Sequence, residues 1–204
     1  IGTHPDLDHV GGLSDVLLRY DVGQVVYEDK ETDARGAVQF RSALERFTQK
    51  GGVVTKLRRG DSIDIGGGAR LSVLFPDRFV TADDTNLGSL VLLLQYGETS
   101  ALFMGDAPTE VEDHIRALEK STAGILDVDV LKLGHHGSRT SSGEAWLRAT
   151  TPEVAIISRG CDNSYGHPHI EVIEHLTQLL IPYLDTCLDG TLTFVSDGHH
   201  MVRE

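Results

Sequence analysis

The chain has 204 residues, of which 40% are hydrophobic and 24% charged, and its formal net charge is -13. This composition is typical of one globular domain with its own core. No apolar run reaches the roughly 18 residues that a membrane-spanning helix needs. The acidic balance argues against a broad basic surface for sequence-independent nucleic-acid binding, so metal ions and a few local donors would have to hold an anionic substrate.

Short apolar runs alternate with helical patterns throughout, without a linker or an internal repeat, so residues 1–204 are predicted to form a single α/β domain. The pattern first predicts a helix over 11–20, a strand over 22–27 and a polar, weakly amphipathic helix ending near Phe47. Five strands should follow, over 53–57, 62–65, 70–75, 89–96 and 100–104, with a hairpin turn at 96–99.

In the second half, Pro108 suits a first helical position, and its helix should run to Lys120. Strands are predicted over 128–133, 154–158 and 183–186, and helices near 142–149 and 168–180. The pairs Asp189-Gly190 and Asp197-Gly198 predict β-turns near the end of the chain. Several strands that need helices on their outer faces favour a layered αββα arrangement.

The densest group of ionisable side chains opens the chain, in Thr3-His4-Pro5-Asp6-Leu7-Asp8-His9-Val10-Gly11-Gly12. Alternate positions of an extended segment point the same way, so His4, Asp6 and Asp8 can converge while His9 turns in from the start of a helix. Four such ligands could hold parts of two metal ions. A helix-capping loop needs only one acid, and it explains neither His4 nor Asp6.

Further metal-capable residues follow predicted strands. Asp106 comes directly after an apolar run, and so does the pair His135-His136. Taken singly, Asp106 could be a helix N-cap, and the histidine pair could be surface polar residues. Loops at one edge of a sheet meet in space, however, so we expect these residues to join the opening cluster in a metal site.

In this order along the chain, the motifs resemble the metallo-β-lactamase fold superfamily of metal-dependent hydrolases. In detail they are similar to the nuclease-like domain of the ComEC family of bacterial competence proteins. The matching segments are 3–12, 86–91, 104–106, 131–138 and 163–169. The resemblance implies a four-layer αββα sandwich with two divalent metal ions, zinc or manganese.

The resemblance also implies roles for single residues. His4 and Asp6 would bind one ion, Asp8 and His9 the other, and Asp106 would bridge the two. His136 fits the final ligand better than His135 does, because Gly137 follows it directly, but both stay candidates. Most relatives have a histidine between the opening motif and the bridging acid. Here that place is taken by Asn86, which could bind weakly through its amide oxygen or leave the position to water.

The oxygen ligands Asp6 and Asn86 make Mn²⁺ a serious rival to Zn²⁺, because hard cations prefer oxygen. Two bridged ions would polarise a phosphoryl oxygen and generate hydroxide at neutral pH. This chemistry suits phosphodiester hydrolysis, and the resemblance implies a DNA nuclease linked to DNA uptake, with Asp8 and His167 as catalytic residues. His167 would contact the scissile phosphate or protonate the leaving oxygen, unless it is a structural turn histidine.

Candidate substrate-binding residues lie beside the histidine pair: Lys132, Ser138, Thr140 and Ser141. The hydroxyls precede a predicted helix, whose N-terminus is a natural phosphate site. Ordinary capping of that helix would use the same groups. Two other functions stay open: hydrolysis of a small lactam, lactone or phosphate ester, and a non-catalytic metal-binding module.

Relatives have several strands before the opening motif, so we expect N-terminal strands to be missing here. The sheet would then be partly open, or covered by another polypeptide or a second copy. ComEC-like function also implies a membrane channel, single-stranded DNA and the extracytoplasmic face of a bacterial membrane; otherwise the domain would be cytoplasmic. Cys161 and Cys187 lack the spacing of zinc or redox sites and are expected to be free core thiols rather than a disulfide.

Overall fold

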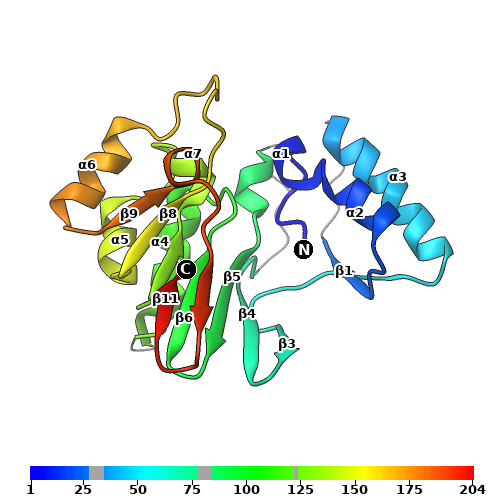
Figure 1. The fold of residues 1–204 in the computed structure, drawn as a ribbon, viewed down its shortest axis with the longest axis horizontal. Helices are drawn as coiled ribbons and strands as arrows, with labels where there is room; N and C mark the ends of the chain where they lie inside the picture. The colour runs from blue at the N-terminus through cyan, green and yellow to red at the C-terminus, as the bar shows by residue number, and fades with distance from the viewer. Residues whose placement is uncertain (28–34, 78–83, 122–123) are drawn as a thin grey trace.

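A computed structural model describes residues 1–27, 35–77, 84–121 and 124–204. Its largest element is a seven-stranded sheet with the order β3-β4-β5-β6-β7-β8-β9 (Figure 1). The strands are β3 (Ser62–Gly66), β4 (Ala69–Phe75), β5 (Val91–Tyr96), β6 (Thr99–Phe103), β7 (Val130–Lys132), β8 (Val154–Ile157) and β9 (Tyr183–Asp185). Neighbours from β3 to β6 pair antiparallel, and those from β6 to β9 pair parallel.

Three helices make the crossovers that parallel strands require, and they cover one face of this sheet. They are α4 (Thr109–Leu118), α5 (Glu144–Thr150) and α6 (Ile170–Gln178). Trp146 and Leu147 of α5 are buried against Leu102 and Leu131 of the sheet and against Leu176 of α6. This cluster is the main hydrophobic core.

The N-terminal part forms a second unit beside the sheet, to the right in Figure 1. It contains α1 (Leu7–Val10), α2 (Leu13–Arg19), β1 (Gln24–Val26), α3 (Arg35–Gln49) and β2 (Val53–Thr55), and β1 pairs parallel with β2. Tyr27 packs edge-on against Phe40, with ring centroids 4.9 Å apart. On the other side, Val26 packs against Leu71 and Val73, so this small sheet faces the large one.

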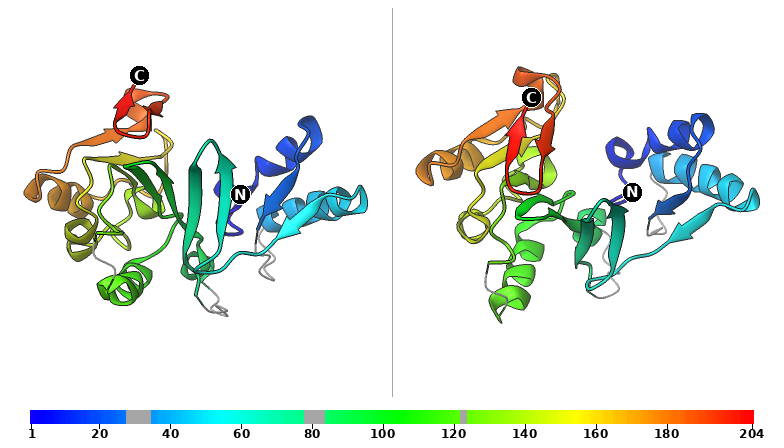
Figure 2. Two further views of the ribbon diagram at one scale, coloured as in Figure 1. Left: turned by 90° about the horizontal axis from the view of Figure 1, so that it is seen from below. Right: turned by 60° about the horizontal axis from the view of Figure 1, so that its bottom comes forward.

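The C-terminal hairpin of β10 (Phe194–Ser196) and β11 (Met201–Arg203) packs on the same face of the large sheet, against Ala101, Val130 and Ile156. Figure 2 shows this hairpin and the N-terminal unit at separate places on that face. The layers therefore run helix, sheet, sheet, helix, which confirms the predicted αββα arrangement. In the described ranges the second sheet consists of two separate strand pairs, and the expected further N-terminal strands stay a prediction.

The structure corrects several expected boundaries. The helix predicted over 11–20 is the shorter α2, which begins at Leu13, and a separate short helix, α1, precedes Gly11-Gly12. Pro108 precedes the first residue of α4 instead of occupying it. Asp189-Gly190 ends the short helix α7 (Thr186–Asp189) and does not form a β-turn. The start of the helix expected after Tyr27 lies outside the described residues.

The prediction of two free core thiols is wrong, because Cys161 and Cys187 form a disulfide with their Cα atoms 5.0 Å apart. Cys161 follows β8 and Cys187 follows β9, and these strands pair in register with Ile157 opposite Asp185. The loops that leave the two strands therefore run side by side, which the sequence separation of 26 does not reveal. No helix among the described residues is long and apolar enough to cross a bilayer.

Candidate metal centre

The candidate centre lies where the N-terminal unit meets the end of the large sheet. Asp106 follows β6, and His135 and His136 follow β7, so the parallel pairing of these strands brings the three residues to one edge. Two backbone hydrogen bonds attach the opening motif there. The Gly2 amide donates to the Val26 carbonyl at 2.9 Å, and the Leu90 amide donates to the Thr3 carbonyl at 3.0 Å.

The Asp106 carboxylate stands at the middle of four imidazole rings. Its Oδ1 lies 3.2 Å from His9 Nε2. Its Oδ2 lies 3.8 Å from His4 Nε2, 3.7 Å from His135 Nε2 and 3.5 Å from His136 Nε2. In each ring Nε2 is the nitrogen that faces the carboxylate. This is the arrangement expected of ligands around a bridging acid.

Two overlapping sets of side chains could each hold an ion. His4, His9 and Asp106 form one set, and Asp8, His9 and His136 form the other, with ligand atoms within 4.8 Å of one another in each. His9 belongs to both, and its Nε2 lies 3.2 Å from His136 Nε2. Asp8 Oδ2 lies 3.2 Å from His136 Nε2 and 3.8 Å from His9 Nε2.

Hydrogen bonds at the opposite ring nitrogens orient these histidines. His136 Nδ1 donates to the Ser158 carbonyl at 2.7 Å, which holds the ring so that Nε2 faces the centre. The Thr3 hydroxyl lies 3.0 Å from His4 Nδ1 and 3.4 Å from His9 Nδ1. One threonine thus supports a ligand-competent orientation in two rings.

His135 is held in the same way, by the Thr140 hydroxyl 3.2 Å from its Nδ1. Both histidines of the pair have left-handed backbone conformations, with φ of 46° for His135 and 55° for His136. Such conformations are uncommon outside glycine and are often found at functional sites. Here they turn two successive side chains toward one carboxylate.

The electrostatics of the cluster favour the deprotonated forms of His4 and Asp106. Burial and the charge of His9 lower the pKa of His4 to about 4, so its imidazole is neutral and its lone pair is available at pH 7. Burial alone would raise the pKa of Asp106. The contact with His9 and the charges of Lys132 and His136 outweigh it and hold that pKa well below its usual range.

The hydrogen bond from His136 lowers the pKa of Asp8 to about 2, and the same bond raises the pKa of His136. Burial, followed by the charges of His135, His169 and His136, lowers the pKa of His167 to about 4. His167 is therefore a neutral imidazole at pH 7.

Lys132 supports the loop of Asp106, and its expected role in substrate binding stays a prediction. Its Nζ donates to the Gly105 carbonyl at 3.1 Å and lies 4.0 Å from Asp106 Oδ1. Burial lowers the pKa of Lys132. On the other side of the loop, the Asp106 amide donates to the Ser89 hydroxyl at 3.1 Å. The position of the carboxylate is thus set from two sides.

Asp6 and Asn86 lie at the side of the centre nearest His4. Asp6 Oδ2 is 3.8 Å from His4 Nε2, and Asp6 Oδ1 accepts a hydrogen bond from the Thr85 hydroxyl at 2.6 Å. Thr85 and Asn86 begin the short helix η1 (Thr85–Gly88).

Within the described part of the chain, the buried atoms Asn86 Oδ1 and His4 Nε2 have no hydrogen-bond partner. Buried polar atoms without a partner are rare and fit a site that is completed by a metal ion. Metal binding by Asn86 stays a prediction.

The hydroxyls proposed for substrate binding make contacts within their own loop. Ser138 and Ser141 are buried, and Ser141 donates to the Ala107 carbonyl at 2.8 Å. Ser138 Oγ lies 3.1 Å from Thr140 Oγ1. The expected phosphate site at the N-terminus of α5 is already filled, because the Glu112 carboxylate accepts hydrogen bonds from the Ser142 and Gly143 amides at 2.5 and 3.0 Å. This loop supports His135, and its role in substrate binding stays a prediction.

Glu112 is a buried acid that sequence reasoning missed, since its position in an amphipathic helix predicts a solvated side chain. It is 1% exposed, and burial raises its pKa to about 7. Between pH 4.5 and 7 the folded chain keeps a proton that the unfolded chain releases, so this group's contribution to stability falls as pH rises.

Glu112→Gln should therefore flatten the pH dependence of unfolding. Relative to the variant, the free energy of unfolding of the wild type should fall by at most about 3 kcal/mol between pH 4.5 and pH 7. Urea unfolding at several pH values measures this change. Glu110→Gln, at an exposed position of the same helix, should keep the wild-type slope. A Glu112→Gln slope equal to that of the wild type would show that folding does not raise the pKa of this carboxyl.

A pocket of about 360 Å³ opens beside the second set of ligands. Its lining includes Asp8, His136, Ser158, Arg159, Gly160, Asn163, Tyr165 and His167. Sequence reasoning assigned no role to Ser158, Arg159, Asn163 or Tyr165. Their position along the chain could have indicated them: Ser158 and Arg159 directly follow β8, and Asn163 and Tyr165 lie in the segment of His167.

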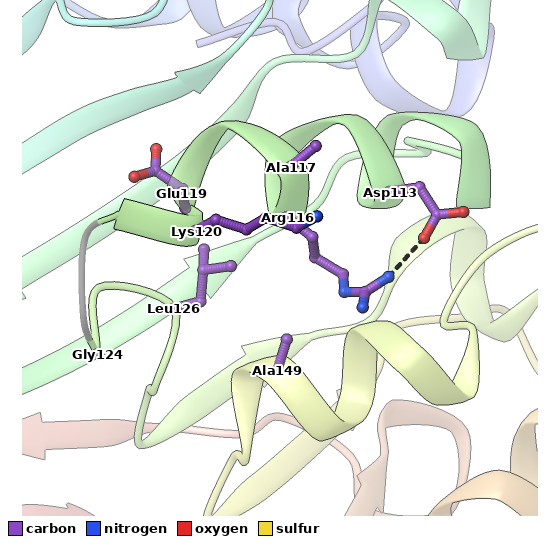
Figure 3. A pocket seen from close by; sticks show the side chains of 8 residues that line it. All are labelled: Asp113, Arg116, Ala117, Glu119, Lys120, Gly124, Leu126 and Ala149. Carbon is purple, nitrogen blue, oxygen red and sulfur yellow. Dashed lines mark hydrogen bonds and ion pairs between the residues drawn. The ribbon is translucent and has the colours of Figure 1, made fainter.

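The His167 ring lies 5.3 Å from the His135 ring and 6.3 Å from the His136 ring, measured between centroids. It therefore stands at the rim of the centre, between the ligand histidines and the pocket. Another pocket, of about 520 Å³, lies along α4 and includes Arg116, whose side chain pairs with Asp113 at 2.7 Å (Figure 3). That pocket shares no lining residue with the centre among the residues described.

Comparison with known proteins agrees with this geometry. A profile of the metallo-β-lactamase superfamily matches residues 1–160. The chain belongs to the metallo-β-lactamase superfamily. Membership indicates a metal-dependent hydrolase, and the histidine and aspartate cluster is the candidate for the metal site that such a family requires.

Among curated proteins, the chain is 32% identical over 195 residues to ComE operon protein 3 of Bacillus subtilis, covering 94% of this chain and 24% of that protein. It is 31% identical over 189 residues to Recombination protein 2 of Haemophilus influenzae, covering 92% of this chain and 21% of that protein. Competence protein ComA of Neisseria gonorrhoeae is 40% identical over 111 residues, which cover 54% of this chain and 16% of that protein. The chain therefore spans about a quarter or less of these relatives, and the similarity to the ComEC family is confirmed.

Among solved structures, CmlA, a diiron β-hydroxylase from Streptomyces venezuelae, matches with a TM-score of 0.58 and 15% identity. The match covers 90% of this chain and 42% of that one. At this identity the similarity supports the fold alone.

Proposed function

We propose that this chain is a metal-dependent phosphodiesterase that cleaves DNA during DNA uptake. The observation that carries the proposal is the set of four imidazoles that face the Asp106 carboxylate beside an open pocket. The competence names of the relatives supply the substrate, DNA, by analogy.

In this proposal His4, His9 and Asp106 hold one divalent ion, and Asp8 and His136 hold the second. Ions bound there would polarise a phosphoryl oxygen and lower the pKa of a water molecule to near neutrality. The oxygen atoms that Asp6 and Asn86 add near His4 support Mn²⁺ as well as Zn²⁺.

The pocket side of the site is formed by Asp8 and His167. Asp8 is ionised at neutral pH, so its carboxylate can bind an ion or orient a water molecule. The neutral His167 ring can donate one hydrogen bond to a phosphoryl oxygen from the rim. These two residues are the proposed contacts between the metal centre and the substrate.

The cellular setting is also proposed by analogy, as a domain on the extracytoplasmic face of a bacterial membrane that works with a channel for single-stranded DNA. The Cys161–Cys187 disulfide supports this setting, because disulfides persist in oxidising compartments.

The test is cleavage of end-labelled single-stranded DNA with Mn²⁺, Mg²⁺ or Zn²⁺ added separately. We expect metal-dependent products from the wild type and an at least 100-fold loss in Asp106→Asn, because charge stabilisation at a reacting centre is worth about 10²–10³ in rate. Asp113→Asn, which changes an exposed carboxylate on α4, is the matched control. Cleavage of a small ester or lactam without cleavage of DNA would contradict the nuclease proposal, and metal binding without any hydrolysis would favour a non-catalytic module.

A further inference from the structure

Tyr165 is an exposed aromatic side chain at the rim of the metal-side pocket. It is 75% exposed, yet its ring is stacked on His167, with centroids 5.7 Å apart and planes 23° apart. His167 is in turn stacked toward His136, at 6.3 Å and 24°. The three rings form a column that leads from a ligand imidazole to solvent, and Tyr165 is its outer member.

The loop that carries Tyr165 is tied down on both sides of it. The Asn163 side chain accepts a hydrogen bond from the His167 amide and donates to the His167 and Gly160 carbonyls, each at 2.9 Å. The disulfide from Cys161 fixes the start of the loop to the segment after β9. A loop held this firmly presents one face of the tyrosine to solvent in a defined position.

The lining of the pocket beside this ring includes the polar side chains of Asp8, Ser158 and Arg159, and the Arg159 guanidinium is fixed by Asp185 at 2.8 Å. Metal ions held beside this lining would attract a phosphate, and an exposed aromatic ring at the rim suits a nucleobase. Aromatic side chains that stack on bases bind single strands because every base has a π-face, whereas the bases of a duplex are stacked on one another.

The net charge of -13 strengthens this argument. A protein that holds a nucleic acid mainly through phosphate contacts needs many Lys and Arg side chains. A chain with an acidic surface needs affinity that does not depend on charge, and stacking supplies about 1–3 kcal/mol per base.

We infer that Tyr165 is a stacking platform that binds an unpaired nucleobase next to the scissile phosphodiester. The inference rests on the proposed function and deepens it, because it makes the substrate class a strand with unpaired bases. A substrate without a nucleobase makes no use of this platform.

The test is binding of a fluorescein-labelled oligothymidylate, measured by anisotropy in EDTA, which prevents metal-dependent cleavage. Tyr165→Ala should weaken binding by about 5-fold to 150-fold, which corresponds to 1–3 kcal/mol, while Tyr165→Phe and Tyr165→Trp should stay within about 3-fold of the wild type. Tyr20→Ala is the matched control, since Tyr20 is 70% exposed and lies at the end of α2, away from the pocket. The fold loss of affinity in Tyr165→Ala should be equal at low and high salt, because salt does not screen stacking.

Two further measurements separate this inference from the proposed function. An oligonucleotide of abasic residues should bind the wild type and Tyr165→Ala equally. Equal binding of oligothymidylate by these two proteins, with metal-dependent cleavage intact, would overturn the stacking inference and leave the nuclease proposal standing. A loss in Tyr165→Phe as large as in Tyr165→Ala would assign the contact to the hydroxyl and also overturn it. A wild type that neither binds nor cleaves the strand would overturn both.

Discussion

Saturating Mn²⁺ or Zn²⁺ should raise the Tm of the wild-type chain by roughly 5–10 °C, and Asp106→Asn should abolish this shift. A ligand present at 100 times its Kd stabilises the folded state by about 2.7 kcal/mol, and each kcal/mol is worth roughly 2–4 °C in a domain of this size. Asp106 carries the effect because all four imidazoles face its carboxylate. An amide in its place keeps the shape but loses the charge that attracts the ions.

The measurement is thermal unfolding by circular dichroism, in EDTA and at several ion concentrations. Asp113→Asn should show the full wild-type shift, because its carboxylate lies on the exposed side of α4 and pairs with Arg116. An Asp106→Asn protein that is stabilised by metal as strongly as the wild type would exclude Asp106 as a ligand. Titration calorimetry of the wild type then counts the ions, for which the two overlapping ligand sets predict two.

Much of the centre was predictable, because the chain places its ligands at strand ends. Asp106 and the pair His135-His136 follow buried strands, and parallel strands bring their ends to one edge. The opening motif needs no tertiary information to suggest a metal site, since His4 and His9 stand within six residues with two acids between them. The structure brings all of these side chains together.

The division of ligands between two ions was less predictable, because it depends on contacts between distant segments. The family resemblance implies His4 with Asp6 at one ion and Asp8 with His9 at the other. In the structure His9 faces both sets, and Asp6 also accepts a hydrogen bond from Thr85. Tertiary packing, and not spacing along the chain, sets which atoms converge.

The support of the site was also hidden from sequence reasoning. The Ser158 carbonyl that orients His136 is a backbone atom, so no residue type at that position signals it. Lys132 has the charge of a phosphate ligand, but its strand position aims the ammonium group at the Gly105 carbonyl. Glu112 fills the anion site at the start of α5 from a helix far away in sequence.

Removal of the disulfide by Cys161→Ser and Cys187→Ser should lower stability by about 3 kcal/mol, because the bond closes a loop of 26 residues and restricts the unfolded chain. The Tm should fall by roughly 6–12 °C. The start of the loop should keep its place at β9, since Arg159 still pairs with Asp185 at 2.8 Å and its amide still donates to the Thr186 hydroxyl at 3.0 Å, whereas the residues after Cys161 lose one restraint. The free energy change therefore arises mainly in the unfolded state.

Thermal unfolding with and without dithiothreitol provides the internal control. The reductant should lower the Tm of the wild type to that of the double variant and leave the variant unchanged. If the reductant leaves the Tm of the wild type unchanged and two reactive thiols are present, the bond does not form.

If the loss of stability is as large as expected, a chain made in a reducing compartment lacks several kcal/mol of its free energy of unfolding. It also lacks one tether of the Tyr165 loop. The metal ligands lie on other loops and make no use of that bond, so reduction should weaken strand binding before it weakens metal binding. If strand binding is lost first, the redox state of the compartment in which the chain folds affects the part of the site that recognises the substrate.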